Sequence, residues 1–125
     1  MPLYTVTTPD GLLSAQQRDA IAVEIVRIHT TIMNVPANFV HSIFPTYPGG
    51  HAYVAADRSP VSSIVGVIRT GHTSEEKSRL VQALWKMLQE KTGVSDRDLS
   101  IALQEVPASQ AMENGVIMPE VGLEK

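Results

Sequence analysis

PLYTVTT, residues Pro2–Thr8, directly follows Met1 and is rich in residues that favour extended structure. A segment of this composition predicts a β-strand. Methionine before a small residue such as proline is commonly removed, and Pro2 would then carry a secondary amine at the end of the chain. An ordinary α-amino group has a pKa of about 7.7–8.0, and burial lowers that pKa because desolvation disfavours the charged form. A strand inside a sheet would therefore hold Pro2 as a neutral base near pH 7, suited to general acid–base catalysis.

Length and composition limit the classes of protein to consider. A chain of 125 residues predicts one domain, residues 1–125. Its formal net charge of −3 gives no indication of nucleic-acid binding or of a basic membrane-binding surface. No stretch reaches the roughly 18 apolar residues of a membrane span. The sequence has no cysteine and no signal-peptide pattern, so a cytoplasmic location is the default expectation.

The first half of the chain has the pattern of a strand, a helix and a second strand. Ser14 and Gln17 have the spacing of a capping box, and the helical apolar period that follows predicts a helix over Ala15–Met33. This helix should end before Pro36, because the residue before a proline disfavours the α conformation. Phe39–Phe44, rich in Phe, Val and Ile, predicts the second strand.

Turn-forming residues separate the two halves. The loop Pro48–His51 is expected to be a turn near the rim of a site. His51–Ala56 reads as a short extended piece or one arm of a hairpin. Asp57–Pro60 predicts a linker or turn and is the best place to divide the chain.

The second half repeats the pattern of the first. Ser63–Arg69 predicts a strand. Thr73 and Glu76 have capping-box spacing before an amphipathic helix, and Gly93 stands where a helix C-terminal glycine belongs. Leu99–Val106 predicts the last main strand, and an apolar piece, 116–118, lies in the tail.

The two pseudo-repeats, about residues 2–58 and 61–119, are therefore two β-α-β units. A helix between strands of one sheet makes those strands parallel and the connection right-handed. Two such units joined edge to edge predict an α/β protein with a four-stranded mixed sheet and both helices on one face. The other face of the sheet would be uncovered, which predicts an oligomer.

A tandem β-α-β chain with proline after the initiator methionine resembles the tautomerase superfamily, and in particular its cis-3-chloroacrylic acid dehalogenase group. The resemblance covers residues 2 to about 119, and the order and spacing of its matching stretches are more specific than any one motif. These stretches are Met1–Thr5, His29, Ile68–Thr73, Glu105–Pro107 and Met112–Gly115.

The resemblance implies a tautomerase-like fold, a homotrimer, and catalysis without cofactor or metal. It implies that Pro2 is the catalytic acid and base, and that His29 and Arg69 bind the carboxylate of a small substrate. Glu113 matches an acid that helps to activate water in the dehalogenase. Independently of the resemblance, the four histidines lack i, i+4 spacing on a helix, so the sequence does not favour a metal site.

Two positions depart from the dehalogenase pattern. His72 stands where the family enzyme has a second carboxylate-binding arginine, and Ala102 stands where it has a tyrosine that assists with water. Histidine is shorter than arginine and can be neutral, so the carboxylate clamp is weaker. Alanine removes a hydrogen-bond donor from the hydration step.

The sequence therefore favours a keto–enol tautomerase with Pro2 and Glu113 as catalytic residues and His29, Arg69 and His72 as substrate-binding residues. Two alternatives stay open, a cis-3-haloacrylate dehalogenase or hydratase and a non-catalytic trimeric binding protein. Each residue also has a structural reading. Arg69 can form a surface ion pair, His29 can be a core histidine with a satisfied hydrogen bond, and His72 and Glu113 can be ordinary loop and tail residues.

Overall fold

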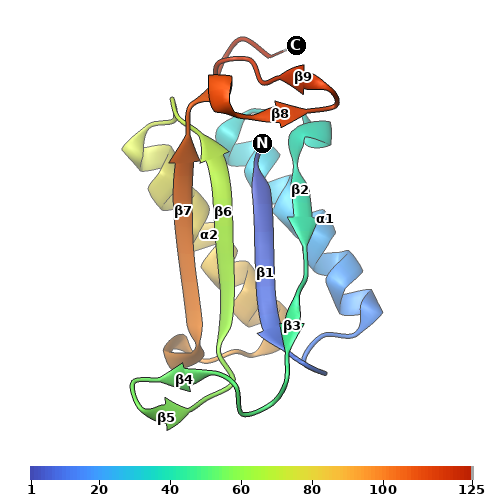
Figure 1. Ribbon diagram of the computed structural model, residues 1–125, viewed down its shortest axis with the longest axis vertical. Coiled ribbons are helices and arrows are strands. Elements are labelled where there is room, and N and C mark those ends of the chain that lie inside the picture. The colour runs from blue at the N-terminus through green and yellow to red at the C-terminus, as the bar shows by residue number, and fades with distance from the viewer. Residues whose placement is uncertain (125) are drawn as a thin grey trace.

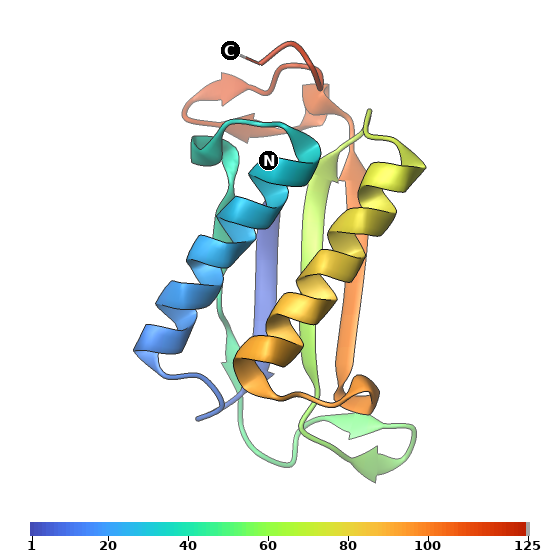
Figure 2. The ribbon, with the colours of Figure 1, turned by 180° about the vertical axis from the view of Figure 1, so that it is seen from behind.

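The computed structural model describes residues 1–124 and shows a mixed sheet with two helices packed on one face (Figure 1). The strands lie in the order β2-β1-β6-β7, and a short strand β3 also pairs with β1. Seen from behind, α1 and α2 run side by side across the sheet (Figure 2). The main strands are β1 (Leu3–Pro9), β2 (His41–Ile43), β3 (Thr46–Tyr47), β6 (Ser62–Arg69) and β7 (Leu99–Val106). This architecture confirms the predicted α/β sheet with both helices on one face.

Both helices begin and end at the residues that the sequence predicts. The helix α1 (Ala15–Met33) starts at Ser14, whose side chain accepts from the backbone N–H of Gln17, and both halves of the capping box are present. The helix α2 (Ser74–Thr92) starts at Thr73 with the same arrangement. Gly93 ends α2 in the left-handed region, with φ at 73°, as a C-terminal glycine does.

Each helix joins a pair of parallel strands. Through α1, β1 pairs with β2 in parallel, and through α2, β6 pairs with β7 in parallel. The two units meet through the antiparallel pair β1 and β6, in which Tyr4 lies opposite Gly66. A Cβ at Gly66 would lie 2.6 Å from Cε1 of Tyr4, so only glycine leaves room for that ring.

The core lies between the helices and the sheet. Alternation along β1 turns Tyr4 and Val6 toward the helices and leaves Leu3 and Thr5 on the other face. The apolar stripe of each helix covers these strand residues. The fully or almost fully buried apolar side chains are Tyr4, Val6, Ile21, Ile25, Ile64, Ile68, Leu80, Leu84 and Leu88.

The opposite face of the sheet is open. Across the paired strands, Ile43, Thr5, Val65 and Ala102 form one row on this face. Leu3, Val67 and Gln104 form the next row. These side chains are partly or fully exposed, and Ile43 is 52% exposed. No helix in residues 1–124 is long and apolar enough to cross a membrane.

Two of the smaller predicted elements differ from the structure, and one agrees with it. Phe39–Phe44 is not a continuous strand, because Ala37–Phe39 forms a 3-10 turn and only His41–Ile43 pairs with β1. The predicted linker Asp57–Pro60 is wrong in part, since Asp57–Arg58 is strand β5 of a hairpin with β4 (Tyr53–Val54). The extended piece within His51–Ala56 is therefore one arm of this hairpin.

The tail also forms a hairpin. Strands β8 (Met112–Glu113) and β9 (Val116–Ile117) pair in antiparallel register. This hairpin lies across the end of the sheet at which the N-terminus and the ends of β6 and β7 meet (Figure 1). It therefore places tail residues over the start of β1.

Candidate active site

The start of β1 lies against the hairpin β8–β9. The terminal ammonium of Met1 forms an ion pair with Oε1 of Glu113. Burial, followed by the charge of Arg69, lowers the pKa of this amine from 8.0 to about 5. The next residue, Pro2, is buried, and its carbonyl accepts a 3.0 Å hydrogen bond from the backbone N–H of His41. The N-terminus is thus fixed between a carboxylate and a guanidinium.

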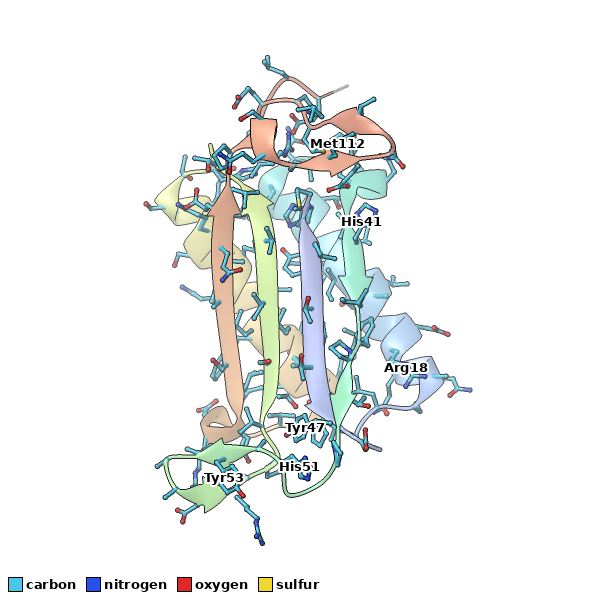
Figure 3. The ribbon with its side chains drawn as sticks, in the orientation of Figure 1. Arg18, His41, Tyr47, His51, Tyr53 and Met112 are labelled. Carbon is cyan, nitrogen blue, oxygen red and sulfur yellow. The ribbon has the colours of Figure 1, made fainter. Side chains whose placement is uncertain are left out.

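Glu113 has one oxygen on the terminal amine and a second that is almost unpartnered. Within residues 1–124, its buried Oε2 makes no hydrogen bond, although Nδ1 of His41 lies 3.1 Å away. That nitrogen also lies 3.1 Å from the carbonyl of Phe39, to which it can donate. His41 and Met112 are at the same end of the sheet, and Tyr47, His51 and Tyr53 are at the other (Figure 3). The expectation that Pro48–His51 borders this site is therefore wrong within one chain.

A small hollow lies beside the terminal amine. Its volume is about 210 Å³, and it is open to solvent on one side. Its walls are Met1, Leu3, His41, Met112 and Glu113. The space has the size of a small organic acid, and Glu113 forms part of its wall.

Arg69, at the end of β6, is 1% exposed although it carries a full charge. Its Nη1 donates to the carbonyl of Pro119 at 2.6 Å, and its Nη2 lies 3.2 Å from Oε1 of Glu124. Its guanidinium carbon lies 5.4 Å from the centre of the Phe39 ring, within the range of a cation–π contact. Arg69 is therefore an internal cation and not the surface ion pair of the structural reading.

His29 is a buried neutral histidine. Its Nδ1 lies 2.8 Å from the hydroxyl of Tyr4, and the two rings meet edge to face. Burial lowers the pKa of His29 from 6.5 to about 3, and the positive charges of His72, the terminal amine and Arg69 add to this effect. The imidazole is neutral at physiological pH, so it can donate one hydrogen bond and accept another but cannot form an ion pair.

His72 lies in the short turn between β6 and α2. Its side chain is 3% exposed, and Nδ1 lies 3.9 Å from Oε1 of Glu76, beyond hydrogen-bond length. Burial lowers the pKa of His72, the charge of Glu76 opposes this effect, and Arg69 lowers the pKa further. His72 thus belongs to the same buried cluster as Arg69 and His29.

The structure brings the five predicted residues to one end of the sheet. Glu113 forms an ion pair with the terminal amine next to Pro2, and the charges of His72 and Arg69 both lower the pKa of His29. Arg69 also lowers the pKa of His72. Ala102 instead lies on the open face, opposite Val65 in the middle of β7. In residues 1–124, no three His, Cys, Asp or Glu side chains are grouped as metal ligands are.

Sequence reasoning missed three members of this end of the sheet. Tyr4 holds His29, His41 approaches Glu113, and Glu124 contacts Arg69. The inward position of Tyr4 follows from strand alternation in Pro2–Thr8, so a signal existed for it. His41 and Glu124 are placed by the register of β2 and by the path of the tail, for which the sequence gives no comparable signal.

The low pKa of His29 predicts that acid destabilises the protein. Between pH 6.5 and about 3, the unfolded chain binds a proton at His29 that the folded chain excludes, so the free energy of unfolding falls as the pH falls. From about pH 7.5 to about pH 5, this one group should remove about 2 kcal/mol. Urea unfolding at both pH values measures the loss.

His29→Gln serves as the control for this prediction, because its amide can meet the Tyr4 hydroxyl and does not titrate. The terminal amine also has a lowered pKa and destabilises in the same direction, so the comparison with the variant isolates His29. An equal loss of stability in both proteins would mean that His29 is protonated in the folded state.

Comparison with known proteins identifies the family. The family Tautomerase_3, described as "Putative oxalocrotonate tautomerase enzyme", matches residues 1–125. Among curated proteins, none matches this chain by sequence. Three solved structures that resemble it are a protein called Ps01740, a protein called N1, described as a member of the cis-3-chloroacrylic acid dehalogenase family, and a fused 4-OT whose structure is a symmetric trimer.

The agreement extends over nearly the full length of each structure. Ps01740 is 32% identical over 89% of this chain and 99% of its own, with a TM-score of 0.86. N1 is 24% identical over 96% and 85%, with a TM-score of 0.92, and the fused 4-OT is 20% identical over 92% and 94%, with a TM-score of 0.83. The last two likenesses support the fold alone. The match over residues 1–125 shows that the chain belongs to the Tautomerase_3 family of the tautomerase superfamily.

Proposed function

We propose that this protein is a cofactor-independent keto–enol tautomerase that uses Pro2, freed of Met1, as general acid and base on a small enol carboxylate. The observation that carries the proposal is the lowered pKa of the terminal amine, held beside Arg69 and Glu113. Pro2 is buried, whereas the side chain of Met1 is 18% exposed, so desolvation acts on a Pro2 amine at least as strongly. Burial and the charge of Arg69 would therefore lower the pKa of a Pro2 amine in the same direction, while Glu113 would oppose this effect.

The reaction needs one base, one anchor and a site that limits water. The substrate carboxylate binds Arg69, the residue with a fixed fork of donors. The Pro2 nitrogen takes the proton of the enol hydroxyl, the O–H electron pair forms the carbonyl, and the C=C pair takes a proton from the Pro2 ammonium. Proton count and charge balance, so no other reactant is required.

Glu113 and His29 have supporting roles in this proposal. The carboxylate of Glu113 faces the amine and stabilises its protonated form during the transfer. His29 is neutral and fixed by Tyr4, so it can donate a hydrogen bond from Nε2 to a substrate oxygen when its Nδ1 accepts from the Tyr4 hydroxyl. His72 adds polar surface next to Arg69.

The proposed assembly is a homotrimer in which the open sheet faces pack against one another. Support comes from the apolar rows on that face and from fused 4-OT structures of similar fold, which are described as trimers. Size-exclusion chromatography with light scattering should give three times the chain mass of 13.6 kDa. A monomer in solution would contradict burial of the open face.

A hydratase or dehalogenase is the second candidate, because Glu113 lines the hollow and its buried Oε2 makes no hydrogen bond within residues 1–124. Ala102 and His72 argue against it, since neither replaces the donors of the dehalogenase pattern. Release of chloride from cis-3-chloroacrylate would support this candidate.

The proposed function is tested by the ketonisation of phenylenolpyruvate and 2-hydroxymuconate, with the intact mass recorded on the same samples. We expect turnover by protein that lacks Met1. In protein that retains Met1, the Pro2 nitrogen is an amide and has no basicity, so turnover should be absent. Protein without Met1 that converts neither enol would contradict the tautomerase and favour a binding protein.

A further inference from the structure

The two terminal nitrogens of Arg69 are already used by the C-terminal tail. Nη1 donates to the Pro119 carbonyl at 2.6 Å and lies 3.4 Å from Oε2 of Glu124, while Nη2 lies 3.2 Å from Oε1. Both side chains are shielded from solvent, with 1% of Arg69 and 6% of Glu124 exposed. A carboxylate thus meets this guanidinium in a two-oxygen arrangement, which is how a bound organic acid would meet it.

The tail is shaped to present Glu124 to Arg69. The backbone N–H of Gly122 donates to Oε2 of Glu124 at 2.8 Å, and the N–H of Leu123 closes a turn on the Glu120 carbonyl at 3.0 Å. Val121 packs on Gly71, where an added Cβ would lie only 3.1 Å from Cβ of Val121. Burial would raise the pKa of Glu124, but hydrogen bonds from Arg69 and Gly122 hold it below its usual value, so the group is an anion.

The attachment of this segment is local. Leu123 is 69% exposed, so its side chain adds little to the packing of the tail. Beyond the hydrogen bond from Arg69 to the Pro119 carbonyl, this segment contacts the end of β6 through Val121 on Gly71 and Glu124 on Arg69. Release of Glu124 would therefore free Nη2 of Arg69, while the hydrogen bond from Nη1 to the Pro119 carbonyl stays in place.

We propose that Glu124 is an internal carboxylate that competes with small organic acids for Arg69 and thereby sets the affinity of the site for acidic ligands. The inference rests on the proposed function in one respect, that Arg69 is the carboxylate anchor. An entering carboxylate must first displace Glu124, so its apparent dissociation constant is the intrinsic one divided by the fraction of molecules in which the tail is released. Neutralising Glu124 raises that fraction.

The test is direct binding of 3-phenylpropionate, an unreactive carboxylate, measured by calorimetry. Glu124→Gln should tighten its binding about tenfold, as expected if the tail is released in roughly one molecule in ten. The neutral 3-phenylpropionamide should show no such gain. Glu120→Gln is the matched control, because it removes an equal charge from an exposed side chain of the same tail and should leave both affinities unchanged.

A double variant shows whether the effect acts through Arg69. In an Arg69→Met background, Glu124→Gln should no longer change the affinity for 3-phenylpropionate. Unchanged or weaker binding by Glu124→Gln alone would overturn the proposal, as would an equal gain in Glu120→Gln or the absence of binding in every variant. Binding is measured without turnover, so a failure of the tautomerase assay leaves this result readable on its own.

Discussion

Replacing Pro2 with alanine is expected to lower kcat/KM for the ketonisation of phenylenolpyruvate by at least about 100-fold, the low end of what a positioned acid–base group contributes. Alanine leaves a primary amine at the same position, but it loses the ring that fixes the nitrogen. The hydrogen bond from the His41 N–H to the carbonyl of residue 2 uses backbone atoms and should persist in the variant. The loss therefore reports on the amine and its orientation.

The controls for this variant concern processing and folding. Alanine at position 2 also permits removal of Met1, so the intact mass of both proteins should show the same N-terminus. Urea unfolding should give similar midpoints, because the one hydrogen bond at position 2, from the His41 N–H to its carbonyl, is made by the backbone and persists with alanine. A variant with wild-type kcat/KM would exclude Pro2 as the catalytic base, and the buried terminal amine would then be structural.

The main elements of the fold could be predicted because local rules determine them. The capping boxes at Ser14 and Thr73 fix the two helix starts, and Gly93 fixes the end of α2. Alternation in the strands and helical period in α1 and α2 agree with one buried face for each element. Where local pattern and tertiary packing coincide, a single sequence is sufficient.

The hairpins show where that agreement ends. In β4–β5 the turn runs through Ala55, which has φ of 52° and is not one of the residues that usually mark such a turn. The hairpin β8–β9 turns at Asn114-Gly115, both with positive φ, and this dipeptide is a strong hairpin signal in the sequence. The composition of the first hairpin gives no turn signal, whereas the second hairpin could have been predicted from its Asn-Gly dipeptide.

The site was partly predictable for a different reason. The family pattern predicts Pro2, Arg69 and Glu113 as site residues. Their hydrogen-bond and ion-pair partners depend instead on strand register and on the course of the tail. His41 reaches Glu113 because β2 pairs with β1 in parallel, with His41 opposite Leu3. Glu124 reaches Arg69 across 55 residues of sequence. A shift of one residue in the register of β2, or in the course of the tail, would separate these partners without changing the sequence pattern.

Replacing Arg69 with methionine is expected to lower kcat/KM for enol carboxylates by about 10²–10⁴-fold, mostly through KM. Two hydrogen bonds between ions are lost, each worth about 1.5–3 kcal/mol. Arg69→Lys keeps the charge but loses the planar fork, so its loss should be smaller, about 10–100-fold, as expected when one of those bonds remains. Steady-state kinetics on 2-hydroxymuconate, with separate values of kcat and KM, measures both variants.

The two variants together separate binding from structure. Arg69 also donates to the Pro119 carbonyl, so methionine there loosens the tail as well as the anchor. Lysine can keep one such contact, and its stability should be closer to that of the wild type in urea unfolding. If Arg69→Lys retained full kcat/KM while Arg69→Met unfolded easily, the guanidinium would serve the tail and not the substrate. If instead KM rises moderately in Arg69→Lys and strongly in Arg69→Met while stability stays nearly constant, the substrate carboxylate must bind the guanidinium of Arg69 directly.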